Sequence, residues 1–288
     1  MSSSFRAPVA DGIPCRRSAN WMLPEIANFY VPIRSSRLLL LDPLPGHATM
    51  LRLDASNPKT MPDLIEEVIP PNRVHLLAGL SDAGKTRWVI PAMLQWEAGL
   101  NVLGRASHPC PWAYVAGDRT IEEARETIRD MSLDPDAIRI IPAFGKHNKN
   151  WVNILLAASA LRPQPRLLVV EGFGDLCEGE RKFEVREFLS RVIAICQGGT
   201  DFPDGLTILG VMESPKLKPA ERYSNPRQRV SGVSAWGYHA STVLLVEAVP
   251  GDDAMETSDR TFWVCTKRGK RRKLEAHFDD RGILTVSS

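Results

Sequence analysis

The sequence predicts an α/β protein built on a mostly parallel, twisted sheet with helices on both faces and antiparallel strands near the C-terminus. Two observations lead to this prediction. From about Asp63 onward, short apolar runs alternate with segments whose apolar residues recur at helical spacing, the pattern of a parallel sheet covered by helices. Near the start of this alternation, residues 79–86 read GLSDAGKT and match the phosphate-binding loop pattern G-x-x-x-x-G-K-[ST].

The chain before this alternation differs in composition. Eight prolines fall within its first 62 residues and leave no room for a long helix, with one candidate strand at Ser36–Asp42. We expect residues 1–60 to form an extended N-terminal arm or a small appendage. Residues 61–288 are expected to form the α/β domain.

Within that domain, each apolar run predicts one strand. The parallel strands are expected at Val74–Ala78, Ala113–Ala116, Ile138–Ile141, Leu167–Val170, Leu206–Met212 and Thr242–Glu247. Short antiparallel strands are expected to follow at Thr261–Thr266, Lys273–Phe278 and Ile283–Val286.

Four helices are predicted between the strands. Thr86–Ala98 and Trp151–Leu161 carry apolar residues at helical spacing. Thr120 and Glu123 form a capping-box pattern that opens a helix running to about Met131. Glu184–Cys196 has a clear apolar stripe, which predicts an amphipathic helix packed on the sheet.

The phosphate-binding loop predicts the chemistry of the site. Its glycines let the backbone wrap a phosphate, the following helix N-terminus supplies positive potential, and Lys85 adds a full charge. Thr86 offers a hydroxyl to a magnesium ion. We therefore expect ATP and Mg²⁺ as cofactors. The expected nucleotide-binding residues are Gly79, Ser81, Asp82, Ala83, Gly84, Lys85, Thr86 and Arg87.

Two acidic residues follow predicted strands and are candidates for the catalytic half of the site. Glu171 ends the run Leu167–Val170 and, with Thr86, is the expected magnesium-binding residue; Asp175 is the alternative acid. Asp118 follows the second strand and is the candidate for orienting an attacking water, although it could also simply begin the next turn.

Composition sets broad limits on the kind of protein. Apolar residues make up 43% and charged residues 24% of 288 residues, as in ordinary globular domains. The five cysteines are scattered without a C-x-x-C pair, so neither a disulfide framework nor a zinc cluster is expected. No apolar run approaches the length of a membrane span and no signal-peptide core follows the N-terminus, so a cytoplasmic location is the expectation.

Positive charge is concentrated in two stretches. The segment 267–273 holds six cations in seven residues, and a second basic segment runs from Lys216 to Arg229. Solvated loops and contacts with a nucleic-acid backbone both fit such stretches. The candidate nucleic-acid contacts are Lys216, Lys218, Arg222, Arg227 and Arg229.

Several segments together resemble the RecA-like ATPase core of the RepA-type plasmid and phage helicases, which are related to the DnaB-type replicative helicases. The resemblance covers about Asp63 to Ser288, although only the phosphate-binding loop is highly specific. The segments that carry it are 68–79 (VIPPNRVHLLAG) with the rest of the loop, 112–118 (WAYVAGD), 169–176 (VVEGFGDL), 208–216 (ILGVMESPK) and 229–236 (RVSGVSAW).

This resemblance implies a RecA-like P-loop fold and a ring, with six subunits expected, that uses ATP to act on single-stranded DNA in replication or recombination of a phage or mobile element. It also implies an arginine finger that completes the ATP site of the neighbouring subunit. Arg268, in the segment 262–269 (FWVCTKRG), is the candidate, and it joins Lys85, Asp118 and Glu171 as an expected catalytic residue.

The chain departs from the family at three polar positions. Glu171 replaces the usual Asp, the position of the common catalytic Glu falls on Gly117 or Asp118, and Glu213 replaces a sensor His. These changes keep two hypotheses open. One is an ATP-hydrolysing ring of the helicase type, and the other is a slow or non-hydrolysing, nucleotide-gated DNA-binding or loading module. A small-molecule kinase is a weaker third reading, because no acceptor site is recognisable.

Overall fold

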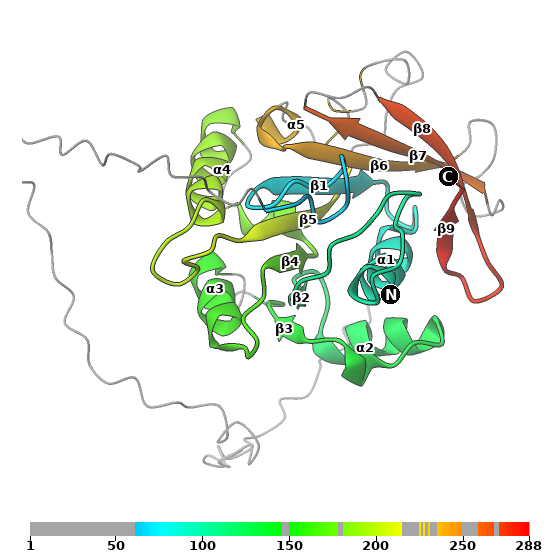
Figure 1. Ribbon diagram of the computed structural model, residues 1–288, viewed down its shortest axis with the longest axis horizontal. Coiled ribbons are helices and arrows are strands. Elements are labelled where there is room, and N and C mark those ends of the chain that lie inside the picture. Colours follow the sequence, from blue (N-terminus) through cyan, green and yellow to red (C-terminus); the bar gives the residue numbers. More distant parts are fainter. Residues whose placement is uncertain are drawn as a thin grey trace, which may run out of the picture. The chain divides into compact units, whose positions relative to one another are not determined.

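A computed structural model describes residues 61–145, 150–177, 181–214, 225, 227, 230, 235–248, 259–267 and 271–287. Across these residues nine strands form a sheet in the order β3-β2-β4-β5-β1-β6-β7-β8-β9 (Figure 1). The appendage and the strand expected within residues 1–60 lie outside the described residues, so both stay predictions.

The nine strands predicted within residues 61–288 all form, with boundaries that shift by no more than two residues. The parallel strands are β1 (Val74–Gly79), β2 (Trp112–Ala116), β3 (Ile140–Pro142), β4 (Leu167–Val170), β5 (Thr207–Glu213) and β6 (Thr242–Ala248). The antiparallel strands are β7 (Asp259–Thr266), β8 (Arg272–Phe278) and β9 (Leu284–Val286). The predicted fold class is therefore confirmed.

The four predicted helices also form, and one more appears. They are α1 (Lys85–Glu97), α2 (Ile121–Asp130), α3 (Trp151–Ala160) and α4 (Lys182–Cys196), while the unpredicted helix is α5 (Ala235–His239). The capping box between Thr120 and Glu123 is present at the start of α2. Two short 3₁₀ helices, η1 (Pro135–Ala137) and η2 (Phe173–Leu176), complete the helical elements of the described residues.

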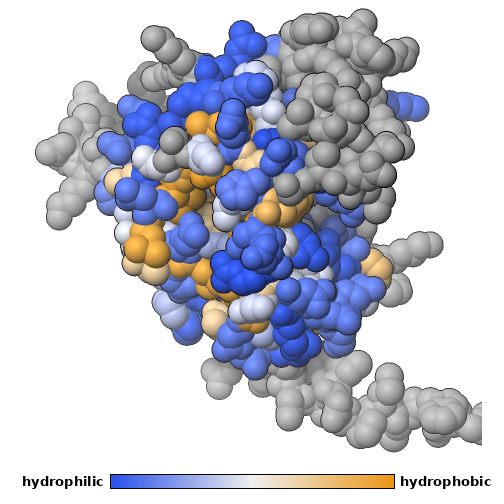
Figure 2. Space-filling view, turned by 90° about the vertical axis from the view of Figure 1, so that its right-hand side faces the viewer, coloured by the Kyte–Doolittle hydropathy of each residue, from blue (hydrophilic) through white to orange (hydrophobic). Residues whose placement is uncertain are grey.

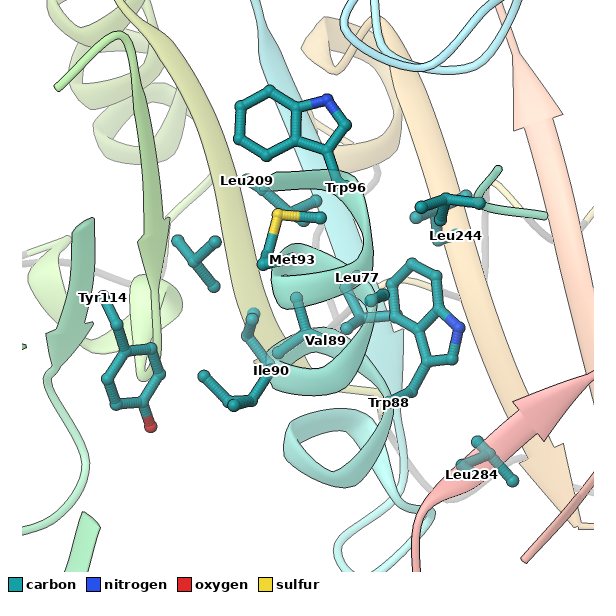
Figure 3. Packing of buried hydrophobic residues seen from close by; sticks show 14 of the residues in the cluster. Leu77, Trp88, Val89, Ile90, Met93, Trp96, Tyr114, Leu209, Leu244 and Leu284 are labelled. Atoms are coloured by element: carbon teal, nitrogen blue, oxygen red, sulfur yellow. The ribbon is translucent and has the colours of Figure 1, made fainter. Parts of the chain in front are cut away.

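One core cluster fills the sheet face that α1 and α2 cover. The buried residues of α1 lie over Leu77, Leu209 and Leu244 of the sheet (Figure 3). Trp88 also packs against Phe262 of β7, with 4.7 Å between the ring centroids. Burial of this apolar surface anchors α1, and therefore the loop that precedes it, to the sheet.

A second cluster fills the opposite face, which α3, α4 and α5 cover. Four aromatic rings gather there with centroids 5.5–6.1 Å apart: those of Trp151, Phe173, Phe188 and Trp236. The outer surface seen in Figure 2 is mostly hydrophilic, with hydrophobic residues interspersed. Among the described residues, no helix is both long enough and apolar enough to cross a membrane.

The parallel strands end at the same edge of the sheet, and this edge positions the candidate site. The phosphate-binding loop follows β1, Asp118 follows β2, Glu171 follows β4, and Glu213 ends β5. Open α/β sheets bind ligands outside the carboxyl ends of their strands. Residues separated by more than 100 positions in the chain are thus brought to one place.

Candidate functional site

A pocket of about 1420 Å³ lies at the carboxyl ends of the parallel strands. It is lined by the phosphate-binding loop, by the residues that follow β2 and β4, and by the end of β5. Six of the eight expected nucleotide-binding residues line it: Ser81, Asp82, Gly84, Lys85, Thr86 and Arg87. Of the other two, Gly79 accepts a hydrogen bond from Lys85, and Ala83 is buried in the core.

The backbone of the loop requires small or permissive residues. Asp82 and Gly84 adopt positive φ angles of 60° and 93°. A Cβ atom at Gly84 would lie 2.4 Å from the Phe278 ring, so only glycine fits both the angle and the space. The sequence pattern and the local geometry therefore agree on why this position is a glycine.

Lys85 is folded back onto the loop. Its Nζ donates hydrogen bonds to the carbonyls of Gly79 (3.1 Å) and Leu80 (2.7 Å). Burial lowers the pKa of Lys85, and the surrounding negative charge opposes this effect. That charge comes from four carboxylates: Glu213, Glu171, Asp118 and Asp82. An ammonium held beside carboxylates and loop carbonyls suits a group that binds phosphate.

Glu171 is contacted by three polar side chains of the pocket region and is only 1% exposed. The Thr86 hydroxyl donates to its Oε1, the Tyr114 hydroxyl donates to its Oε2, and Arg119 Nε lies 3.1 Å from Oε2. Burial and then the charge of Asp118 raise the pKa of Glu171 to about 7, although Arg119 and the two hydroxyls act in the opposite direction.

Asp118 lies beside Glu171, and Arg119 bridges the two acids. Arg119 Nε is 3.1 Å from Asp118 Oδ1, and its Nη1 donates to the Thr127 hydroxyl at 3.2 Å. Burial is the largest influence on the pKa of Asp118 and raises it, but the interactions with Arg119 and Glu171 together outweigh burial and lower the pKa. A Cβ at Gly117 would lie 2.1 Å from the Glu171 carbonyl, so the carboxylate at this strand end can come only from Asp118.

Two of these residues, Tyr114 and Arg119, were not expected from the sequence. Tyr114 lies in the middle of an apolar strand, where a tyrosine is ordinarily a core residue. Arg119 stands next to Asp118 in the chain, and that adjacency was the available signal for a pair of charges at the strand end. Both reach Glu171 only because β2 and β4 are neighbours in the sheet.

The donor set fits a magnesium ion. Mg²⁺ prefers oxygen ligands, keeps several waters, and is commonly held by one or two protein groups plus substrate phosphates. The Thr86 hydroxyl and the buried Glu171 carboxylate are such groups and are in direct contact. Asp175, the alternative acid, also lines the pocket from η2.

The C-terminal hairpin closes one side of the pocket. Phe278 of β8 contacts the loop at Gly84, and Arg87 Nη1 donates to the Gly282 carbonyl at 3.2 Å. Phe278 and Gly282 also line the pocket. The strands β8 and β9 therefore contribute to the site although they follow the loop by nearly 200 residues.

The structure describes only one of the five expected nucleic-acid contacts, Arg227. Lys216, Lys218, Arg222, Arg229 and the expected finger Arg268 lie outside the described residues. Arg227 is described, and its guanidinium turns inward to donate to the carbonyls of Gly237 (2.8 Å) and Cys265 (2.9 Å), among others. That position fits a residue holding α5 against the sheet better than one contacting phosphate.

Comparisons with known proteins agree with this architecture. A model of the AAA domain family matches residues 40–218. No curated protein matches the chain. A crystal structure of a KaiC-like protein from the hyperthermophilic archaeon Pyrococcus horikoshii OT3 superimposes with a TM-score of 0.54 at 15% identity, covering 78% of this chain and 94% of that one. At this identity the likeness concerns the fold, which is that of a RecA-like P-loop NTPase.

Proposed function

The chain belongs to the AAA domain family, and from this premise we propose that it is a magnesium-dependent ATPase that acts on single-stranded DNA as a helicase-type ring. The observation that carries the ATPase proposal is the contact between Thr86 of the loop and the buried Glu171, with Lys85 in the same pocket. A carboxylate is costly to bury, so its retention at this strand end favours a binding role.

Each residue of the pocket has a role in this proposal. Lys85 would leave the loop carbonyls and pair with the nucleotide phosphates. Thr86 and Glu171 would hold Mg²⁺, which neutralises charge on the phosphates when bound. Asp118 would accept a hydrogen bond from the attacking water and so orient it, while Arg119 and Tyr114 hold the acids in place.

Two sequence features support the DNA-binding and ring-forming parts of the proposal. The basic segment from Lys216 to Arg229 follows β5 in the sequence, and β5 ends at the pocket, so the chain connects this segment to the nucleotide site. Arg268 follows β7 and is proposed to reach the ATP site of a neighbouring subunit, as the resemblance to RepA-type helicases implies. Arg268 and most of the basic segment lie outside the described residues, so the DNA contact and the arginine finger are parts of the proposal.

Steady-state ATP hydrolysis with and without an oligo-dT strand tests this function. We expect turnover that needs Mg²⁺ and that rises several-fold when the single strand is added. A hydrolysis rate that is the same with and without every polynucleotide tried would reject the DNA-acting motor, while leaving ATP hydrolysis itself in place.

A second candidate function is a nucleotide-gated DNA-binding or loading module with slow or no turnover. Its support is that Arg119 already pairs with Asp118, and that Glu213 stands where a hydrogen-bond donor would be expected. Native mass measured with and without ATP, together with the Arg268→Ala variant, separates the two. Assembly with ATP, and turnover lost in Arg268→Ala with ATP binding intact, would exclude the non-hydrolysing module.

A further inference from the structure

The ring of Tyr238 is displayed on the surface of α5. It is 70% exposed, whereas Trp236 and Gly237 beside it are buried. The helix that carries it is firmly held. A Cβ at Gly237 would lie 1.9 Å from the Arg227 carbonyl, and the Arg227 guanidinium donates to the carbonyls of Gly237 and Ala240. The exposed aromatic ring is therefore presented by a fixed backbone and not by a loose loop.

Two nitrogen-bearing side chains, those of Lys267 and His239, lie against this ring. Lys267 Nζ lies 5.8 Å from the centroid of the Tyr238 ring. The His239 ring packs edge-on against it, with 5.2 Å between centroids and an interplanar angle of 81°. Arg186 belongs to α4, the helix that packs against α5 (Figure 1), and its charge acts on His239. The ring is thus contacted by residues of α5 and of the end of β7, and α4 adds a further cation to this region.

Arg186 and Lys267 supply the positive charge of this region. Within the described parts of the chain, neither Arg186 nor Lys267 takes part in an ion pair. The two acids nearest to Arg186 in sequence are already engaged: Glu184 accepts the Arg181 backbone N–H, and Glu187 pairs with Arg191. Burial lowers the pKa of His239, and the charges of Arg186 and Lys267 lower it further, so the His239 ring is neutral at pH 7 and the positive charge of this surface comes from Arg186 and Lys267.

An exposed aromatic ring among unpaired cations matches the chemistry of single-stranded nucleic acid. Bases stack on aromatic side chains through their π-faces, and Lys or Arg contacts the backbone phosphates. A duplex hides its base faces, and an acidic peptide offers charge without a π-face to stack. In the sequence, five residues separate the basic segment 216–229 from α5, and Lys267 begins the basic run 267–273.

We propose that Tyr238, with Lys267, His239 and Arg186, forms a binding site for single-stranded nucleic acid in which a base stacks on the tyrosine ring. This inference rests on the proposed function and assigns to it a site among the described residues. The site shares its five-residue helix with Trp236, which lines the nucleotide pocket and packs on Phe173 at 5.7 Å. A strand bound at Tyr238 is therefore next to the wall of that pocket.

Fluorescence anisotropy of a labelled oligo-dT strand with the full chain tests the site. Tyr238→Ala should raise the Kd about tenfold, the loss expected for one stacked base, whereas Tyr238→Phe keeps the π-face and should stay within about twofold. Lys267→Gln should weaken binding and reduce its salt dependence by about one phosphate contact. Phe144→Ala, which removes another exposed aromatic ring, is the matched control and should bind as the wild type does.

The outcomes separate this inference from the proposed function. Wild-type binding that Tyr238→Ala leaves unchanged overturns the stacking site but keeps the DNA-acting ATPase. Absence of any single-strand binding by the wild type overturns both. If duplex DNA displaces the labelled oligo-dT as well as a single strand does, base stacking on Tyr238 is also overturned. Competition by oligo-U and by oligo-dT establishes whether RNA or DNA fills the site, and unchanged ATP binding by Tyr238→Ala confirms that the variant is folded.

Discussion

At the scale of single residues, Glu171 organises the pocket because groups from three parts of the chain converge on it. Thr86 contacts it from α1, Tyr114 from β2, and Arg119 from the segment after β2. The two hydroxyls and the guanidinium together offset the cost of burying a carboxylate beside Asp118. The contacts also fix where the Glu171 oxygens lie, which is a condition for holding a metal ion in a defined place.

Arg119 is predicted to favour the ionised form of Glu171, because its charge opposes the rise in pKa that burial causes. Arg119→Ala should therefore raise the Mg²⁺ concentration needed for half-maximal ATP hydrolysis. For a partly exposed charge pair we expect about a two- to fivefold change. The matched control is Arg125→Ala, which removes an exposed arginine of α2 paired with Asp136. Equal Mg²⁺ requirements in the wild type and Arg119→Ala would contradict the role given to Arg119.

His75 predicts a pH dependence of stability. It is fully buried in β1, Nε2 contacts the Pro70 carbonyl at 2.9 Å, and Nδ1 has no partner among the described residues. Burial lowers its pKa from 6.5 to about 4, so the folded state keeps it neutral while the unfolded state takes a proton below 6.5. The contribution of His75 to the free energy of unfolding is fully present above pH 6.5 and falls by about 3 kcal/mol as the pH drops toward 4.

Urea unfolding at several pH values between 7 and 4 measures this effect. The variant His75→Gln keeps a donor for the Pro70 carbonyl but has no titratable ring. The wild type should lose more stability than the variant across this range, and parallel pH profiles for the two proteins would contradict the assignment to His75.

The residues of the site were predictable to different degrees. Lys85, Thr86 and Glu171 follow from the loop pattern and from an acid at a strand end, signals that lie within a few residues of the chain. Tyr114 and Arg119 could not be predicted, because their role depends on the pairing of β2 with β4, which local sequence does not encode. The inward turn of Arg227 likewise depends on carbonyls of α5 and β7.

At the scale of elements, the ends of β2 and β4 approach unusually closely. Gly117 lies against the Glu171 carbonyl, and a Cβ at Gly172 would lie 3.2 Å from the Asp118 nitrogen. Glycines at both positions let the two strand ends come together and hold Asp118 beside Glu171. The spacing of the two acids is therefore set by the backbone as well as by Arg119.

Gly117→Ala should disturb this approach, since its Cβ would meet a backbone oxygen that cannot move aside easily. We expect a loss of about 1–3 kcal/mol in unfolding free energy, measured by denaturant unfolding, together with reduced ATP turnover. Gly199→Ala is the control, because a Cβ there meets nothing within 4 Å, and it should change stability by no more than about 0.5 kcal/mol. If Gly117→Ala is as stable as the wild type, the two strand ends can separate without cost, which contradicts this account.

Most elements were predictable because their apolar periodicity is strong. The strands and the long helices appear within a few residues of the predicted positions. The helix α5 was missed because it spans five residues, includes a glycine, and depends on Arg227 for its backbone contacts. The packing of β8 on the phosphate-binding loop was also missed, since it joins segments nearly 200 residues apart.

At the scale of the whole molecule, the strand order is what turns separate motifs into one site. The sequence predicted a parallel sheet but not the order β3-β2-β4-β5-β1-β6, which places β4 and β5 between β1 and β2. This order brings the loop after β1, the acids after β2 and β4, and Glu213 of β5 around one pocket. Trp236 of α5 lines that pocket and Tyr238 of the same helix carries the proposed nucleic-acid site, so the two sites share one short helix.

The central claim is that this pocket binds ATP with magnesium and hydrolyses it, and the most direct test compares ATP turnover by the wild type and by Lys85→Ala at saturating Mg²⁺. We expect Mg²⁺-dependent turnover by the wild type and a loss of at least about 100-fold in the variant, because Lys85 lines the pocket and is the cation that we propose neutralises the transferred phosphate. Turnover by Lys85→Ala equal to that of the wild type would contradict the account.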